Sequence, residues 1–194
     1  MPLRNSHKIK ICREAFLEVK SVVHDNYGAD NIGDPERPII DEDGDKMPIS
    51  GLVSFMRSEA KKNAGRQPTR LQRIKAYDNA AREFKCGRCM GQSSMAAIYL
   101  ASKGVACSFV TVDMNQNNDQ HVFVIADIDK PRVGVSLAAL GSIPVCDPWL
   151  SLKAITETTL GLGAGATTCL NHSGSLLSLG YSNVIKTIEF IAAE

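Results

Sequence analysis

The chain has 194 residues, of which 44% are hydrophobic and 22% are charged, and this composition is typical of a globular protein with one well-buried core. Its formal net charge of +1 gives no reason to expect nucleic acid or an anionic membrane as a partner. The sequence has no apolar stretch long enough to span a membrane and no apolar core of a secretory signal near its start. We therefore expect neither membrane insertion nor export by the general secretion route.

Cysteines are scattered through the chain and do not form the dense pattern of a small secreted disulfide domain. We therefore expect reduced thiols in a cytosolic compartment, which need not belong to the cell that makes the protein. The six cysteines are Cys12, Cys86, Cys89, Cys107, Cys146 and Cys169.

The N-terminal part, residues 1–84, is predicted to be mainly helical. Apolar residues recur at helical intervals across 8–24, whereas 25–48 are rich in Gly, Pro and Asp and are predicted to form a loop. Within this loop "DEDGD" (41–45) hints at a calcium site, but its glycine is misplaced and the twelfth position is Leu52 instead of Glu. We interpret the segment as a solvated turn.

Two further helices are predicted before Cys86, one from Ser50 to about Asn63 and one from Pro68 to Phe84. Basic residues gather on both helices, and we interpret them as solvated helix faces rather than as a binding surface. These basic residues are Arg57, Lys61, Lys62, Arg66, Arg70, Arg73 and Lys75.

The pattern changes from helix to strand after Gly104, a residue typical of a helix C-terminus. A helix is predicted over 88–103. The segments 106–112 and 121–127 are rich in β-branched and aromatic residues and are predicted to form a hairpin with a polar tip. A third strand is predicted over 143–146, where it ends at "DPW".

The C-terminal part contains "GLGAGATT" (161–168), which follows no clear strand. We predict a mobile loop here and not a dinucleotide-binding loop. A final apolar segment, 183–192, fits either a helix or a strand.

Cys86 and Cys89 lie three residues apart in "KCGRCMGQSSMAAIYL" (85–100). A structural zinc site usually needs four ligands, commonly as two close pairs, and no second pair follows in the sequence. A thioredoxin-like redox pair should follow a strand, and the residues before this pair are predicted to be helical. The residues that could complete a zinc site through the tertiary fold are Cys146, Cys169 and His172.

Cys89 fits the position of a nucleophile if its helix begins near Gly87. The thiol would then lie in the first turn, where exposed N–H groups and the positive end of the helix dipole favour a thiolate and can form an oxyanion hole. Ser93 and Ala96 share the face of Cys89 and would let the helix pack closely against a sheet. Cys86 would lie just before the helix, so we prefer Cys89.

A catalytic thiol needs a base and a group that orients the base. His121 opens its predicted strand and Asp147 closes the third strand, so they would meet at one edge of the sheet if these strands are antiparallel neighbours. His121 shares a strand face with Phe123 and Ile125, and we expect the Cys89 helix to cover that face. The histidines with less support are His7, His24 and His172.

Three blocks in this order, "CGRCMGQSSMAAIYLASKGV", "DQHVFVIAD" and "PVCDPW", are similar to the Cys-His-Asp domains of bacterial effectors and toxins with a papain-like or transglutaminase-like fold. The similarity covers about residues 85–150, and "CDPW" is its most distinctive part. It implies Cys89 as nucleophile, His121 as base and Asp147 as the orienting partner. Gln92 matches a glutamine of such motifs. The glutamine that papain carries before its cysteine has no counterpart here, so backbone donors would have to form the oxyanion hole.

The resemblance implies a papain-like core in which the nucleophile helix packs on a small antiparallel sheet. We expect an α+β fold in a single catalytic domain (1–194), with this core over 85–194 after a helical N-terminal part (1–84) that matches no family we can name. The implied activity is acyl transfer from protein glutamine side chains, by deamidation or transglutamination, without a metal or organic cofactor. The alternatives are a cysteine protease with the same triad and a non-enzymatic binding module with a decayed triad. The implied partner is a host protein, met in the host cytosol after delivery by a specialised bacterial secretion system. The oligomeric state stays open.

Overall fold

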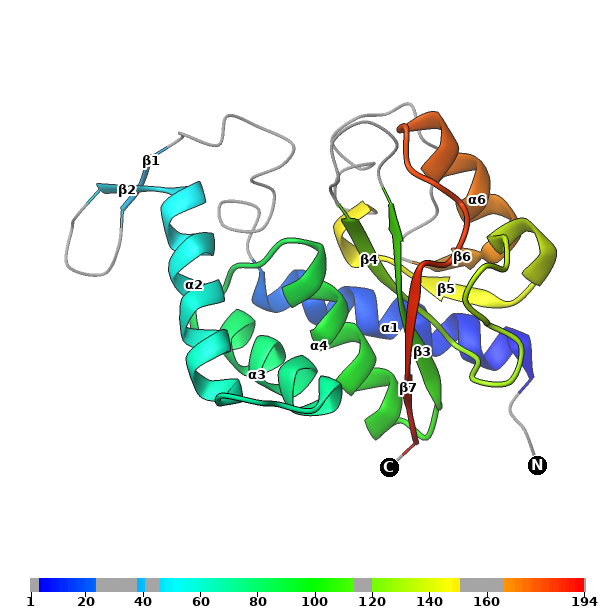
Figure 1. Cartoon of the computed structure of the whole chain (residues 1–194), viewed down its shortest axis with the longest axis horizontal. Helices are drawn as coiled ribbons and strands as arrows, with labels where there is room; N and C mark the ends of the chain where they lie inside the picture. The colour runs from blue at the N-terminus through cyan, green and yellow to red at the C-terminus, as the bar shows by residue number, and fades with distance from the viewer. Residues whose placement is uncertain (1–3, 24–37, 41–45, 114–119, 151–165, 194) are drawn as a thin grey trace.

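The computed structural model describes residues 4–23, 38–40, 46–113, 120–150 and 166–193. In these residues helices pack around a five-stranded antiparallel sheet, and a separate two-stranded sheet lies beyond α2 at the far left of Figure 1. The predicted α+β class is therefore confirmed.

The four helices predicted in the N-terminal half are present, with shifted starts. The helix after the loop begins one residue before Ser50. The next begins after Thr69 and not at Pro68, because Thr69 and Gln72 form a capping box in which the Thr69 hydroxyl accepts the Gln72 N–H at 3.2 Å and the Gln72 side chain accepts the Thr69 N–H at 2.8 Å. The helices are α1 (Asn5–Val22), α2 (Ile49–Ala64), α3 (Arg70–Glu83) and α4 (Cys89–Ser102).

The loop predicted over 25–48 contains a short antiparallel pair at its end. Strand β1 (Pro38–Ile40) pairs with β2 (Lys46–Pro48). The prediction of a loop is therefore wrong for these two strands. The segment 41–45, interpreted as a solvated turn, lies outside the described residues.

The five-stranded sheet has the order β6-β5-β4-β3-β7, and every neighbouring pair is antiparallel. The three predicted strands are present as its centre, and the undecided segment 183–192 contributes an edge strand. The tail also contributes strand β6 at the end of "GLGAGATT", so the prediction of a loop is wrong for residues 166–168, while residues 161–165 lie outside the described part of the chain. The strands are β3 (Cys107–Asp113), β4 (Gln120–Ile125), β5 (Pro144–Cys146), β6 (Ala166–Thr168) and β7 (Thr187–Ile191).

Two hydrophobic layers cover the two faces of the sheet. On one face α4 packs against Val122 and Val124 of β4, and α1 packs against α4, β5 and β6. On the other face Phe123 and Ile125 pack with residues from α6 (Cys169–Ser178) and the short helix η1 (Leu137–Leu140). The prediction that the Cys89 helix covers the Phe123 face is therefore wrong, because α4 lies on the opposite face.

Helix α4 is held on its face by small residues and one polar contact. Ser93 and Ala96 are fully buried, and the Ser93 hydroxyl donates to the Val122 carbonyl at 2.8 Å. Gly104, with a φ of +75°, ends the turn after α4 in the left-handed conformation that glycine tolerates. Among the described helices none is both long and apolar enough to cross a membrane.

Candidate active site

Cys89 is the first residue of α4, directly after the N-cap residue Arg88. The turn that leads into the helix includes Lys85, whose φ of +50° is left-handed. The side chain of Gln92 is fully buried and donates from Nε2 to the Gly87 carbonyl at 2.6 Å. The Gln92 amide therefore holds the turn that presents Cys89, which gives this glutamine a positioning role.

The two cysteines of the C-x-x-C pair lie in different environments. Cys86 is fully buried in a hydrophobic cluster with Met56 and Tyr77, contributed by α2 and α3. Cys89 is half-buried at the start of α4, where it packs against both hydrophobic layers of the sheet. The pair therefore does not act as one unit in this fold.

Cys89 also differs from the remaining cysteines. All six cysteines fall within the described ranges, all are free thiols, and the other five are buried. Burial raises the pKa of Cys107 and of Cys169, the latter to about 12. Such thiols are poor nucleophiles at neutral pH, so Cys89 is the best placed of the six to react.

His121 lies at the start of β4, next to the start of α4. The Cys89 Sγ lies 3.9 Å from the carbonyl oxygen of Gln120, and the thiol interacts with the His121 ring. The ring is 1% exposed and packs against three aromatic residues, with centroid distances of 5.7 Å to Phe123, 5.1 Å to Trp149 and 5.3 Å to Tyr181. These contacts fix the plane of the imidazole.

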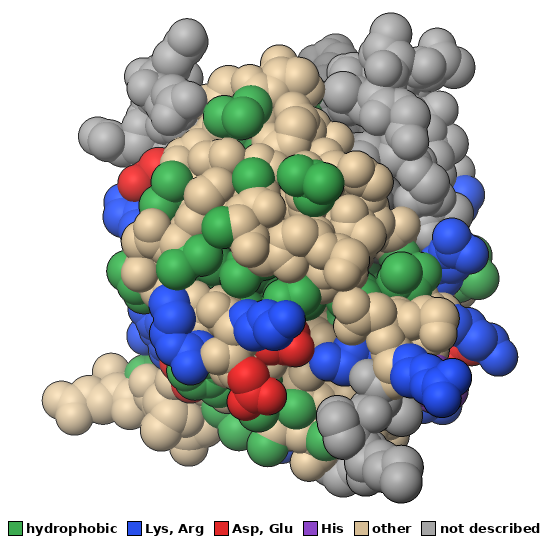
Figure 2. All heavy atoms as spheres, turned by 90° about the vertical axis from the view of Figure 1, so that its right-hand side faces the viewer, with side chains coloured by type: hydrophobic (Ala, Val, Ile, Leu, Met, Phe, Trp, Pro, Cys, Tyr) green, Lys and Arg blue, Asp and Glu red, His purple; other side chains and the backbone are tan. Residues whose placement is uncertain are grey.

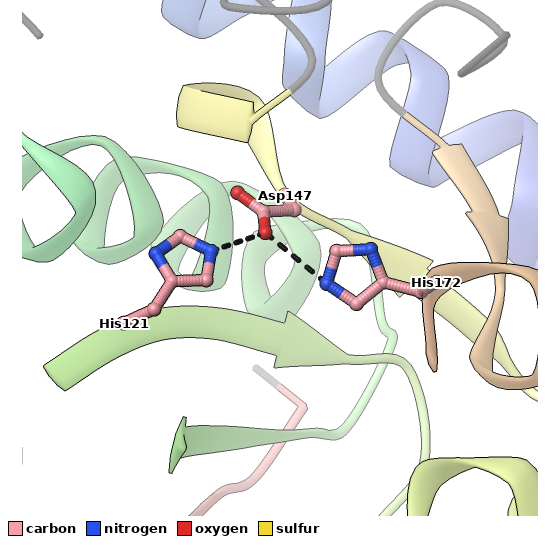
Figure 3. A group of neighbouring side chains, drawn as sticks. All are labelled: His121, Asp147 and His172. Carbon is pink, nitrogen blue, oxygen red and sulfur yellow. Dashed lines mark hydrogen bonds and ion pairs between the residues drawn. The ribbon is translucent and has the colours of Figure 1, made fainter. Parts of the chain in front are cut away.

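Asp147 follows β5 and faces His121, because β5 pairs with β4 in antiparallel register. The Asp147 Oδ2 lies 2.5 Å from the His121 Nε2 (Figure 3). The Asp147 Oδ1 accepts the Leu150 N–H at 3.0 Å, which caps the helical turn that begins at Pro148. One carboxylate thus ends the strand, caps the next turn and binds the histidine.

The charges of this pair support one another. Burial opposes a charge on the His121 ring, but the Asp147 carboxylate and, to a smaller extent, Cys89 outweigh it and raise the pKa of His121 to about 10. Burial likewise opposes the charge of Asp147, and the two neighbouring histidines outweigh it and lower the pKa of Asp147 well below its usual range. At neutral pH the pair is therefore an imidazolium and a carboxylate.

His172, which the sequence analysis gave little weight, lies on the other side of Asp147. It comes from α6, is 1% exposed, and its Nε2 lies 3.2 Å from the same Oδ2 that His121 approaches (Figure 3). This separation is that of an ion pair, but the alignment is not that of a hydrogen bond. The signal for its helix is the spacing of Cys169, His172 and Leu176 by three and four residues, all of them buried.

His121, Asp147 and His172 also form a group with metal-ligand atoms within 4.8 Å of one another. Two ligands of a tetrahedral zinc ion with bonds of about 2.1 Å are roughly 3.4 Å apart. The 2.5 Å between the His121 Nε2 and the Asp147 Oδ2 is too short for an ion between them and fits a hydrogen bond. The His121–Asp147 contact therefore fits a hydrogen bond better than a metal site.

The fold brings Cys89, His121 and Asp147 together in the order thiol, imidazole, carboxylate, although Cys89 and His121 reach one another from opposite faces of the sheet. They meet because α4 begins where β4 begins, at the end of the sheet. The other two histidines set aside in the sequence are not part of this group: His7 lies in α1, and His24 lies outside the described residues.

No family of known proteins matches the chain, and neither a curated protein nor a solved structure matches it.

Proposed function

We propose that the protein transfers an acyl group from glutamine side chains of a protein substrate through a thioester on Cys89. The observation that carries this proposal is a half-buried thiol at a helix N-terminus next to a histidine whose other ring nitrogen is bound by a buried carboxylate. The resemblance of the three sequence blocks to effector domains with a papain-like or transglutaminase-like fold adds support, and with it we assign the core to that fold.

In the proposed reaction His121 and Cys89 form an imidazolium–thiolate pair. Asp147 is hydrogen-bonded to the His121 Nε2, which leaves the other ring nitrogen, Nδ1, to accept the thiol proton. The Cys89 Sγ attacks the side-chain amide carbon of the glutamine, and the amide oxygen takes the negative charge. His121 then returns its proton to the amide nitrogen, the carbon–nitrogen bond breaks, and ammonia leaves a thioester behind.

The second half of the reaction frees the enzyme. Attack by water, with His121 accepting its proton, gives a glutamate side chain, whereas attack by an amine gives a new amide bond. In both cases the carbon–sulfur bond breaks and Cys89 is regenerated. The first turn of α4 offers backbone N–H groups that have no acceptor within the helix, and we assign the oxyanion to them.

The setting that we propose is the cytosol of a host cell, after delivery by a specialised bacterial secretion system. The six reduced thiols suit such a compartment. The substrate in this setting is a host protein, and no metal or organic cofactor takes part in the steps above.

The test is intact mass spectrometry of candidate host proteins after incubation with the wild type and with Cys89→Ala. Deamidation, cross-linking and backbone cleavage leave three different mass changes, so the same measurement separates the proposed activity from a cysteine protease with the same triad. Mass changes that also appear with Cys89→Ala would contradict a thioester on Cys89. A binding module would pull down its partner and change no mass.

A further inference from the structure

Two hollows in the surface adjoin one another near the start of α4. Both are lined by Arg73 and by Met90, the residue that follows Cys89 in α4. One of them is also lined by Gln120, whose carbonyl oxygen is 3.9 Å from the Cys89 Sγ. We call the combined depression the basic groove, and the residues that define it are Lys61, Arg66, Arg70, Arg73, Met90 and Gln120.

The basic groove carries positive charge that the protein itself leaves mostly uncompensated. Its four cationic side chains are exposed, and its lining includes one carboxylate, Glu189, which lies 3.8 Å from Arg70. Lys61, Arg66 and Arg73 form no ion pair within the described part of the chain. A ligand with carboxylates would therefore find three unpaired cations in the basic groove.

The face of the molecule around α6 differs from the basic groove in its distribution of charge. The basic groove is lined by the end of α2, by α3, by the start of α4 and by residues of β3, β4 and β7. On the face around α6, lysine and arginine side chains are interspersed with aspartate and glutamate, and hydrophobic side chains gather above them (Figure 2). The concentration of cations in the basic groove thus distinguishes it from that face.

We propose that the basic groove binds an acidic segment of the substrate protein, so that the target glutamine lies among aspartate or glutamate residues. To interpret this binding as substrate recognition, the inference rests on the proposed function of Cys89. The binding of an acidic peptide does not depend on that function. Opposite charges at such a surface speed association and select partners. Four of the basic residues interpreted from the sequence as solvated helix faces therefore belong to a substrate site.

A polypeptide fits the basic groove better than a nucleic acid does. Proteins that bind single-stranded nucleic acid combine cations with exposed aromatic rings on which bases stack. The aromatic residues that line the two hollows, Phe109 and Tyr77, are both only 7% exposed.

The experiment measures binding of a fluorescein-labelled peptide, EEEEQEEEE, by fluorescence anisotropy. It uses the Cys89→Ala protein so that no reaction occurs, and KKKKQKKKK and a single-stranded oligonucleotide are the comparison ligands. The groove variants are Arg66→Glu/Arg73→Glu and the milder Arg66→Gln/Arg73→Gln. The control is Arg13→Glu/Lys130→Glu, which changes the net charge equally at exposed residues outside both hollows.

We expect the acidic peptide to bind, and the charge-reversed groove variant to weaken it at least about tenfold, with a smaller loss for the neutral variant and little for the control. Equal losses in the groove variant and the control, no preference over the basic peptide, or tighter binding of the oligonucleotide would each overturn the inference. Ammonia release from the same peptide by the wild type tests the chemistry separately. Groove-dependent binding without turnover would contradict the proposed function and leave the binding inference standing.

Discussion

The carboxylate of Asp147 has three neighbours and is only 3% exposed. Its Oδ1 accepts the Leu150 N–H, and its Oδ2 lies between the Nε2 atoms of His121 and His172. A buried charge of this kind is costly unless it is paired, and here the pairing is complete on both oxygens. Asp147 therefore joins the stability of the fold to the chemistry of His121 in one side chain.

The variant Asp147→Asn separates these two roles, because an amide oxygen can still cap Leu150 while the negative charge is lost. We expect turnover to fall by roughly 10²-fold or more, since His121 loses the partner that holds its imidazolium. Iodoacetamide alkylation of Cys89 at pH 6 should slow as well. If the variant loses thermal stability but keeps the wild-type pH profile of alkylation, Asp147 has only a structural role, in ending β5 and capping the turn at Leu150.

Cys89 should react alone among the six thiols. Because the other five are buried, a single fast alkylation by iodoacetamide at slightly acidic pH is expected, mapped by peptide mass spectrometry to Cys89. The matched control is Cys86→Ser, which should keep this labelling although it disturbs the cluster around Met56. Fast labelling that persists in Cys89→Ser would point to another nucleophile.

At the scale of the elements, the sequence predicts the helix that carries Cys89 and the strands that position His121 and Asp147. It does so because helical periodicity, strand alternation and a proline that stops a strand are all local signals in the sequence. The face of the sheet on which α4 lies is not a local property. The prediction that α4 covers the His121 face of the sheet failed because Cys89 lies beside the end of β4 and contacts both hydrophobic layers. A thiol in this position can reach His121 from a helix on either face.

Helix α6 was missed for a related reason. Its ten residues contain several Ser and a Gly, which lower helix propensity, and its start at Cys169 follows directly from strand β6 without a loop. The helix depends on the Thr168 hydroxyl, which accepts the Asn171 N–H at 3.4 Å, and on packing of its buried side. Tertiary contacts therefore decide this element, and with it the position of His172.

Replacing His172 tests what α6 brings to the site. His172 helps to hold the pKa of Asp147 low, and a lowered folded-state pKa contributes stability that is present above the ordinary value of 3.8 and lost at lower pH. We expect His172→Leu to be less stable than the wild type at pH 6, with a difference that shrinks only below about pH 3, as the pH approaches the folded-state pKa of Asp147. His172→Gln should lose less, because its amide N–H can donate to the carboxylate. Urea titrations from pH 6 down to pH 2 measure this. A difference that does not change with pH would reduce His172 to packing against Phe123, with a ring-centroid distance of 4.7 Å.

At the scale of the whole molecule, the buried ion pair makes folding depend on pH. The folded-state pKa of His121 is about 10, above the ordinary value of 6.5. Between these values the folded chain keeps a proton that the unfolded chain has lost, so the free energy of unfolding falls as pH rises. The window from about pH 6.5 to 8.5 isolates this effect, because thiols titrate near 9.0 in the unfolded chain.

We expect urea unfolding to show decreasing stability of the wild type across this window and a shallower decrease for His121→Gln. The matched control is His7→Gln, at an exposed position on α1, which should retain the wild-type slope. Parallel slopes for the wild type and His121→Gln would show that His121 is neutral in the folded protein.

The order of strands has a consequence for synthesis on the ribosome. Strand β4, which carries His121, pairs with β3, and the outer partner of β3 is β7 at Thr187–Ile191, contributed from far along the chain. Contacts between such distant segments form late, after the intervening residues have been made. A nascent chain that ends before α6 contains Cys89 and His121 but lacks both His172 and the edge strand β7, which pairs with β3. The machinery around Cys89 therefore assembles only after most of the polypeptide has emerged.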